Sequence, residues 1–224
     1  MVTPAPVRVL LADDEPGVRA GLRTVLAADP GIEVAAEAAD GREVLGLLAR
    51  HRIGVVLLDI RMPVLDGLAA LAELRRRDPA QRVVILTTYG ERDYVLRAVA
   101  LDANGFLLKS GDPYELLQGV RAVAAGGTCL SPSVAAMVVS DLRSRQHDDA
   151  DRESAQGRLA GLPPREQAVL RGIAAGRSNA EIAGDLRVTE TTVKGYTTAL
   201  FARLGVRNRV EAALAAWQAG WRER

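Results

Sequence analysis

Five short apolar runs, each followed by a helical pattern, dominate the first 126 residues. The runs are rich in β-branched residues and cover residues 7–12, 32–36, 54–58, 82–87 and 104–108. Strands that alternate with helical stretches of ten or more residues form βαβ units, which build parallel sheets covered by helices on both faces. The third run is apolar at four successive positions, Val55 to Leu58, which indicates a central strand. We therefore expect an α/β domain with a doubly wound, five-stranded parallel sheet.

The remainder of the chain has a different pattern. Residues 133–145 favour one more helix, and residues 146–157 are polar and charged, as is typical of a linker. Four short helices with brief connections are then predicted over residues 164–175, 179–186, 190–204 and 208–219. We therefore expect a first domain in residues 1–128, a helix and linker in residues 129–158, and a small all-α domain in residues 159–224.

Charge is divided unevenly between these parts. The 224 residues have a net charge of +1, yet residues 159–224 hold ten basic and six acidic side chains, which gives +4 there and −3 for the rest. A basic module beside an acidic one weakly favours a polyanion-binding head. The single cysteine, Cys129, excludes an internal disulfide, and no apolar run approaches the roughly 18 residues that span a bilayer. We expect a cytoplasmic protein that does not enter the membrane.

Reactive side chains follow four of the predicted strands. The first strand ends in Asp13-Asp14-Glu15, the third in Asp59, the fourth in Thr87-Thr88 and the fifth in Lys109. Ligands of doubly wound sheets bind in the crevice outside the carboxyl ends of the strands. A single aspartate after a strand is often only a helix cap or turn residue, but four strand ends carrying such groups in order favour one shared site.

The residue types at these strand ends point to phosphate chemistry. Carboxylates crowded together repel one another unless a hard cation joins them, and oxygen ligands suit Mg²⁺. With Mg²⁺ neutralising phosphoryl oxygens, Asp59 could act as a nucleophile and form an acyl phosphate. Lys109 would supply a positive charge to the phosphoryl group, and Thr87 a rotatable hydroxyl. Lys109 is one of only two lysines among 29 basic residues, so its presence at a strand end needs a reason.

Residues 5–126 resemble the receiver domain of bacterial response regulators, which has a flavodoxin-like fold. The resemblance rests on LADDE at 11–15, DIRMP at 59–63 followed by DG at 66–67, LTTY at 86–89 and GFLLK at 105–109. It implies that Asp13, Asp14 and Asp59, with the backbone carbonyl of Arg61, hold Mg²⁺ while a sensor histidine kinase phosphorylates Asp59. Thr87 and Phe106 would form the switch pair. Two residues depart from the common pattern: Ser110 replaces a frequent proline, and Phe106 lacks the hydroxyl of the commoner tyrosine.

The second domain contains the pattern of a helix-turn-helix. Ser178 and Glu181 have the spacing of a capping box before a short helix, and Thr189 can cap the next helix. In that next helix a buried stripe is predicted at Val193, Tyr196 or Thr197, Leu200 and Leu204. The opposite face carries Thr191, Lys194, Gly195 and Thr198, which could approach bases and phosphates in a major groove. Pattern alone leaves open an ordinary solvated bundle.

Residues 162–212 resemble the LuxR-type helix-turn-helix. The matching segments are RE at 165–166, GRSNAEIA at 176–183, TVK at 192–194 and RLGVRNR at 203–209. With the receiver, this pattern is that of the NarL/FixJ class. The resemblance implies that double-stranded promoter DNA is contacted by the residues Asn179, Thr191, Thr192, Lys194, Thr198, Arg203 and Arg207. It also suggests that the last helix, through Val210, Leu214 and Trp217, pairs with its twin in a homodimer; packing onto its own bundle is the alternative.

The leading hypothesis is a two-component response regulator in which phosphorylation of Asp59 controls DNA binding and transcription, and which is not an enzyme in the usual sense. A Mg²⁺-dependent phosphohydrolase would also fit the acidic site, but such an enzyme needs an acid–base carboxylate two residues after the nucleophile, where Arg61 stands. A DNA-binding protein that ignores phosphorylation is a third possibility.

Overall fold

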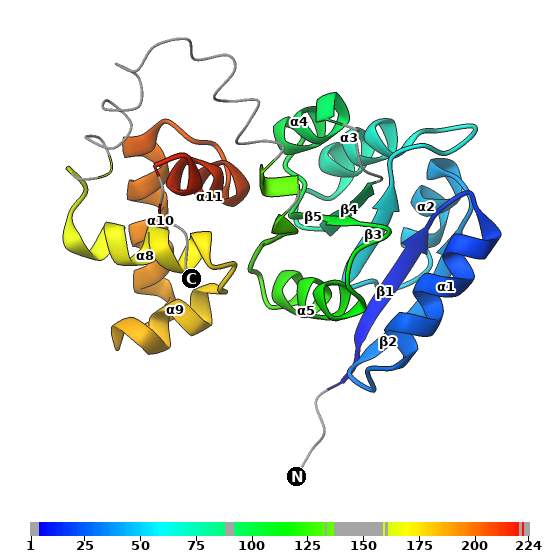
Figure 1. Ribbon diagram of the computed structural model, residues 1–224, viewed down its shortest axis with the longest axis horizontal. Helices are drawn as coiled ribbons and strands as arrows, with labels where there is room; N and C mark the ends of the chain where they lie inside the picture. The colour runs from blue at the N-terminus through cyan, green and yellow to red at the C-terminus, as the bar shows by residue number, and fades with distance from the viewer. Residues whose placement is uncertain are drawn as a thin grey trace.

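A computed structural model describes residues 5–87, 92–132, 134–136, 159, 161–219 and 221. An α/β domain and a smaller helical domain lie side by side (Figure 1). The helix expected over residues 133–145 falls mostly outside the described residues, although residues 134–136 are helical. The linker expected over residues 146–157 lies entirely outside them. Among the described helices, none has the length and apolar character needed to cross a bilayer.

A parallel sheet forms the centre of the first domain. Its strands are β1 (Val7–Ala12), β2 (Ile32–Ala38), β3 (Val55–Asp59), β4 (Arg82–Thr87), β5 (Gly105–Leu108) and β6 (Cys129–Leu130), in the spatial order β2-β1-β3-β4-β5-β6. The doubly wound fold is confirmed, with β3 buried along its whole length. Strand β6 was not expected, because two residues are too few to show an alternating pattern. It pairs closely with β5 because Gly105 has no side chain: a Cβ there would lie 2.3 Å from Cys129 Sγ.

Helices cover the sheet on both faces. On one face lie α1 (Pro16–Ala27) and α5 (Pro113–Ala124), and on the other α2 (Gly41–Leu48), α3 (Gly67–Arg77) and α4 (Arg92–Ala100). Each face buries its own apolar cluster, which is the expected result of parallel βαβ units. Asp40, Asp66 and Asp112 cap α2, α3 and α5 by accepting backbone N–H bonds.

The second domain consists of α8 (Pro164–Ala174), α9 (Asn179–Leu186), α10 (Glu190–Leu204) and α11 (Arg209–Gln218) in its described part. Both bonds of the predicted capping box between Ser178 and Glu181 are present, and Thr189 caps α10. Val193 and Leu200 are fully buried in the helical core, as the stripe on α10 predicted. Leu204, Tyr196 and Thr197 are half-buried.

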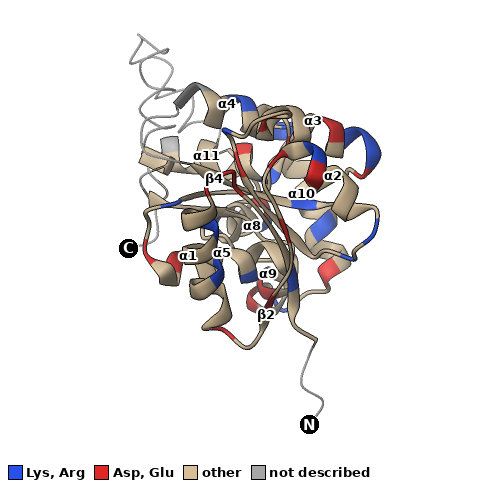
Figure 2. Ribbon diagram, turned by 90° about the vertical axis from the view of Figure 1, so that its right-hand side faces the viewer, with Lys and Arg blue, Asp and Glu red and all other residues tan. Residues whose placement is uncertain are grey.

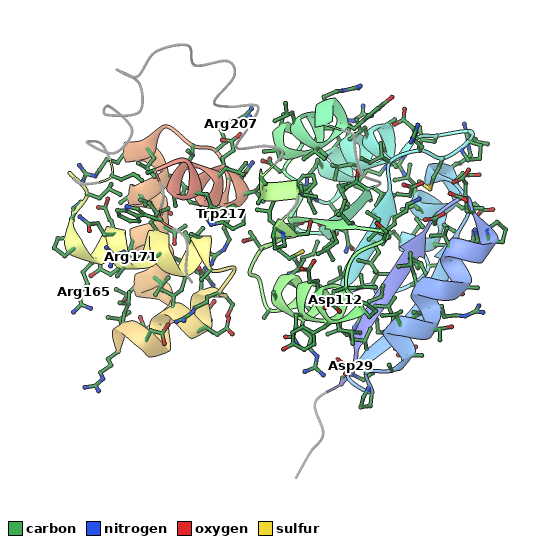
Figure 3. The ribbon with its side chains drawn as sticks, viewed as in Figure 1. Asp29, Asp112, Arg165, Arg171, Arg207 and Trp217 are labelled. Atoms are coloured by element: carbon green, nitrogen blue, oxygen red, sulfur yellow. The ribbon has the colours of Figure 1, made fainter. Side chains whose placement is uncertain are left out.

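The two domains touch through α11. Val210 and Leu214 are 2% and 4% exposed and belong to the apolar cluster that contains Val99 of α4. Asn208, the N-cap of α11, donates its amide N–H to Asp102 Oδ1 at 2.6 Å and to the carbonyl of Val99 at 3.3 Å. This face of α11 therefore packs against the first domain, and not only against its own bundle. Trp217 lies between α11 and α8, where it donates to the carbonyl of Ala174 at 3.1 Å (Figure 3).

Candidate functional site

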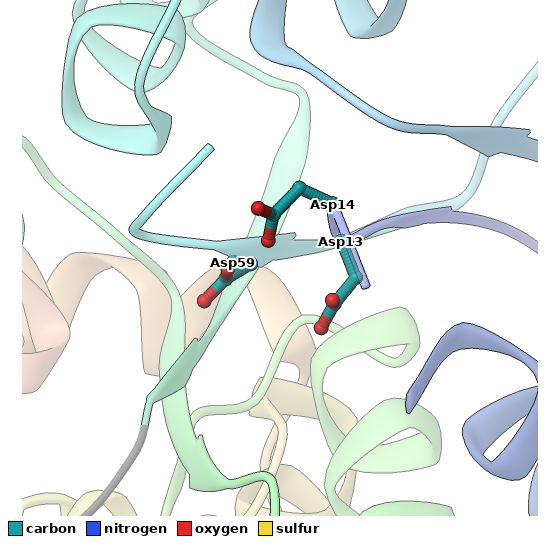
Figure 4. A group of neighbouring side chains, drawn as sticks. All are labelled: Asp13, Asp14 and Asp59. Atoms are coloured by element: carbon teal, nitrogen blue, oxygen red, sulfur yellow. The ribbon is translucent and has the colours of Figure 1, made fainter. Parts of the chain in front are cut away.

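Three carboxylates meet at the carboxyl ends of β1 and β3. Strands β1 and β3 are neighbours, with Ala12 paired to Leu58, so Asp13 and Asp14 emerge next to Asp59 (Figure 4). One carboxylate oxygen from each lies within 4.8 Å of the others. Asp13 is fully buried and Asp59 is 3% exposed, while Asp14 is exposed. The acidic cluster is therefore enclosed on one side and open to solvent at Asp14.

Lys109 reaches this cluster from β5. Its Nζ lies 2.9 Å from Asp13 Oδ2 and 2.9 Å from Asp59 Oδ1, and its side chain is only 10% exposed. The backbone N–H of Lys109 donates to the Thr87 carbonyl at 2.9 Å, which fixes the end of β5 beside the end of β4. One ammonium group faces three carboxylates, so the cluster keeps a net charge of −2 when all four groups are ionised.

Burial shapes the titration of these groups. Desolvation raises the pKa of Asp59, and the Asp13 charge adds to this effect, while the Lys109 ammonium and the Ile60 N–H oppose it. Desolvation also acts to lower the pKa of Lys109, but hydrogen bonds to Asp13 and Asp59 and their charges outweigh it and raise that pKa. Lys109 is therefore held in its charged form between the two buried carboxylates.

The donor set fits a hard divalent cation. Asp13 Oδ1 accepts the Glu15 N–H at 2.9 Å, but Oδ2 is buried without a hydrogen bond of good geometry, although Lys109 lies within ion-pair distance. A buried oxygen with unused acceptor capacity, beside two more carboxylates, is suited to Mg²⁺. Arg61, two residues after Asp59, lies in the β3–α3 loop with an exposed side chain, and its carbonyl as a ligand remains a prediction.

The predicted switch residues are both fully buried. Thr87 ends β4 and Phe106 lies in β5, where it pairs with Ile85. Phe106 belongs to the apolar cluster under α4, together with Val95 and Ala98. The end of β4 is thus next to Lys109, while the Phe106 ring is packed in the core beneath α4.

The sequence patterns did not predict how closely the β3–α3 loop approaches Asp59. The β3–α3 loop folds back so closely that a Cβ on Gly67 would lie 2.0 Å from the Asp59 carbonyl oxygen, and Gly67 donates its N–H to Ile60. Only glycine allows this approach. The Asp66-Gly67 pair was visible in the sequence, but which backbone it approaches depends on the tertiary structure.

The predicted DNA contacts on α10 share one exposed surface. Thr191, Lys194 and Thr198 are exposed, and no atom lies within 4 Å of a Cβ built on Gly195. Lys194 pairs with Glu190 at 3.1 Å but remains 64% exposed, so it can turn toward a phosphate. Thr192 is half-buried, and its hydroxyl lies 2.8 Å from that of Thr189 at the helix start.

The other three predicted contacts have intramolecular partners. Arg203 donates to Glu166 at 3.1 Å, and Arg207 makes two hydrogen bonds with Glu211 through Nε and Nη2. Asn179 accepts a hydrogen bond from Arg209 at 3.0 Å, beside a cavity between the domains. Thr191, Lys194 and Thr198 on α10 are therefore exposed, whereas Asn179 is half-buried beside this cavity.

Comparisons with known proteins agree with this arrangement. Residues 9–121 match the model of the response regulator receiver domain, and residues 160–216 match that of bacterial regulatory proteins of the luxR family. The nitrate/nitrite response regulator protein NarP of Escherichia coli is 38% identical over 209 residues, which cover 93% of this chain and 94% of NarP.

Solved structures lead to the same family. The response regulator ChrA of a heme-sensing two-component system is 34% identical, with a TM-score of 0.53 over 97% of this chain and 99% of that one. The isolated receiver of RcsB from Salmonella enterica serovar Typhimurium, solved with the phosphomimetic BeF₃⁻, is 26% identical, with a TM-score of 0.56 over 59% of this chain and 99% of that one.

These findings decide between the hypotheses raised by the acidic site. The family consists of transcription factors and not of conventional enzymes, so the phosphohydrolase alternative is not supported. The chain belongs to the two-component response regulators that join a receiver domain to a LuxR-type DNA-binding domain.

Proposed function

We propose that Asp59 is the phosphoacceptor of this response regulator and that a sensor histidine kinase is the donor. In the transfer, an Asp59 carboxylate oxygen bonds to phosphorus as the bond from phosphorus to the kinase histidine nitrogen breaks. The observation that carries the proposal is the position of Lys109, whose ammonium bridges Asp13 and Asp59 at 2.9 Å. Lys109 is therefore placed to pair with the new phosphoryl oxygens.

Mg²⁺ is the proposed cofactor, held by Asp13, Asp14, Asp59 and the Arg61 carbonyl. When bound, it would neutralise the charge that accumulates on the phosphoryl oxygens. The net charge of −2 in the cluster, and the buried Asp13 Oδ2 with its unused acceptor capacity, support this assignment. The relative solved with the phosphomimetic BeF₃⁻ supports phosphorylation of the receiver rather than the choice of metal.

Thr87 and Phe106 are the proposed route from the phosphoryl group to the second domain. The Thr87 hydroxyl would turn toward the phosphorylated side chain, and Phe106 would repack under α4. Because α4 and Asp102, just after it, contact Asn208, Val210 and Leu214, a shift of α4 would weaken the hold on α11. Phe106 has no hydroxyl, so its part in the switch would be ring packing alone.

Promoter DNA is the proposed ligand of the second domain, through Asn179, Thr191, Thr192, Lys194, Thr198, Arg203 and Arg207. The active form is proposed to be a homodimer on a two-fold DNA site, joined through the α11 face that the receiver covers here. The domain limits that go with this function are 1–128 for the receiver, 129–158 for the connection and 159–224 for the DNA-binding head, with β6 at the start of the connection completing the receiver sheet. The two family matches lie within these limits.

The phosphoacceptor is tested by labelling the full chain with radioactive acetyl phosphate and MgCl₂. Wild type should incorporate label and Asp59→Asn should not, because the amide is not a nucleophile. Asp112→Asn is the matched control, since Asp112 caps α5 on the surface and asparagine caps helices equally well. Stoichiometric labelling of the Asp59→Asn variant would remove Asp59 from its proposed role.

Control of DNA binding is tested by mapping bound DNA across the genome for wild type, Asp59→Asn and Asp112→Asn. The Asp59→Asn variant should lose occupancy at sites that the other two proteins share. Equal occupancy of all three, together with unchanged DNA affinity on adding BeF₃⁻, would instead identify a DNA-binding protein that ignores phosphorylation.

A further inference from the structure

A cavity of about 420 Å³ lies between the receiver and the DNA-binding head. Its charged lining consists of three arginines, Arg75, Arg82 and Arg209, and one carboxylate, Asp102. Three guanidinium groups against one carboxylate give this lining a net charge of +2. The cavity lies away from the Asp13–Asp59 cluster, which has the opposite sign.

The arginines of this cavity have no carboxylate partner within ion-pair distance among the described residues. Arg75, part of the basic run at the end of α3 that is blue in Figure 2, donates to the carbonyls of Asp102 at 2.8 Å and Gln81 at 2.7 Å. The half-buried Arg82 makes no side-chain hydrogen bond or ion pair within the described ranges, and its Nη2 would lie 4.0 Å from a Cβ on Gly126. Arg75 is therefore held by hydrogen bonds, whereas the Arg82 guanidinium has no hydrogen-bond or ion-pair partner among the described residues.

Arg209 carries the strongest sign of a missing partner. It donates through Nη1 to Asn179 at 3.0 Å and also to the Arg177 carbonyl, but its Nε is buried and has no acceptor. Burial lowers the pKa of Arg209 to about 10, and the Glu181 charge offsets only part of that effect. A half-buried guanidinium without an ion-pair partner costs free energy, and an anion bound beside it in the cavity would reduce that cost.

The lining groups come from both domains. Arg75, Arg82 and Asp102 belong to the receiver, whereas Arg209 and Asn179 belong to the head. The backbones of the two domains also approach closely at Gly127, where a Cβ would lie 2.4 Å from the Gly176 carbonyl oxygen. A ligand bound here would touch both domains at once.

We infer that this cavity is a binding site for a small phosphate dianion, either inorganic phosphate or a phosphate monoester, that bridges the receiver and the head. A charge of −2 matches the lining, and the forked N–H groups of arginine match phosphate oxygens better than a point charge does. A ligand that binds only when the domains meet stabilises that arrangement. It would also occupy Asn179, which the proposed function assigns to DNA phosphate, so the anion would oppose DNA binding.

The test is calorimetric titration of the full-length, unphosphorylated protein at about pH 8, where phosphate is mostly a dianion. Ionic strength is kept constant with chloride, and EDTA is present so that no cation draws phosphate to the acidic cluster. Inorganic phosphate and glycerol phosphate are the probes, and acetate is the monoanion control. We expect one phosphate per chain, and weaker binding of acetate. Binding of glycerol phosphate alone would assign the site to phosphate esters, and binding of both probes to the phosphate group itself.

Matched variants decide whether the cavity is responsible. Arg82→Gln should weaken phosphate binding by at least about tenfold, because it removes a charged donor. Arg52→Gln removes the same charge from an exposed position and should leave affinity unchanged. Arg82→Lys keeps the charge without the fork, so it should lie between them, and it provides the comparison if Arg82→Gln lowers the melting temperature.

Two outcomes would overturn the inference. One is the absence of phosphate binding up to about 10 mM, a weak affinity even for a small ligand. The other is equal affinity of Arg82→Gln and Arg52→Gln, which would place any bound phosphate elsewhere. Neither result affects the labelling of Asp59, so failure here and failure of the proposed phosphoacceptor are distinguishable.

Discussion

Replacing Lys109 by methionine tests the electrostatics of the acidic cluster most directly. Methionine is similar in length, so the change removes the charge with little loss of volume. Each ion pair of Lys109, at 2.9 Å, is worth about 6 kcal/mol in an effective dielectric of about 20, before the desolvation of the charges is subtracted. Removing one partner of a buried ion pair typically costs about 3–5 kcal/mol, because the other charge is left buried and unpaired. We expect a loss of that size in EDTA.

The assay is urea unfolding followed by two signals. Both tryptophans, Trp217 and Trp221, are in the head, so their fluorescence reports the unfolding of that domain, whereas far-ultraviolet circular dichroism reports both domains. Lys194→Met is the matched control: the chain has no third lysine, and Lys194 is 64% exposed in a surface pair with Glu190. That pair is worth at most about 0.5 kcal/mol. The Lys109→Met loss should appear in the receiver transition.

The stability loss of Lys109→Met should depend on magnesium and on pH, each in a defined direction. The pKa of Lys109 is raised, so its stabilising charge is complete below the ordinary value of 10.5 and is lost only as pH rises through the higher folded value. The pKa of Asp59 is also raised, so the cost of its charge is complete above that folded value and disappears as pH falls from it to the ordinary 3.8. The deficit of Lys109→Met should therefore be constant near neutral pH, shrink in acid, and shrink when MgCl₂ replaces EDTA. A variant within about 1 kcal/mol of Lys194→Met in EDTA, or one indifferent to MgCl₂, would refute this reasoning.

Three further predictions concern other parts of the molecule. Asp29→Asn should destabilise the protein at neutral pH but not in strong acid. The hydrogen bond from Arg121 lowers the pKa of Asp29, so its stabilising charge is complete above 3.8 and is lost as pH falls through the folded value. A loss of stability that persists in acid would contradict this. Val64→Gly should stabilise the receiver by up to about 1 kcal/mol in urea unfolding. Val64 is 72% exposed, so little packing is lost, and its φ of 64° is one that β-branched residues disfavour. A loss of stability would count against backbone strain at this position. Asn208→Asp should keep the helix cap but place a carboxylate against Asp102, which should separate the two domains. Small-angle X-ray scattering should then give a larger radius of gyration, while the melting temperature of the head is unchanged. An unchanged radius would show that this contact does not hold the domains together.

Local patterns predicted the secondary structure well because each element carries its own signal. Strands β1 and β4 and helices α9 and α10 have the predicted bounds, since β-branched runs, Ser178 and Thr189 act over a few residues. The meeting of Asp13, Asp59 and Lys109 was also predictable, because parallel strands bring their carboxyl ends to one edge. These conclusions need only the order of residues and the handedness of βαβ units.

Contacts between distant segments were not predictable, because no local pattern encodes them. Strand β6 depends on the empty space above Gly105, and the loop over Asp59 depends on Gly67. The α11 face at Val210 and Leu214 is apolar whether it meets a twin, its own bundle or the receiver, and only the tertiary structure showed that the receiver covers it. The sequence by itself determined the fold of each domain and the chemistry of the acidic cluster. The tertiary structure decided how the domains meet and where buried charges lack partners, because burial depends on what packs against a side chain and not on its neighbours in the chain.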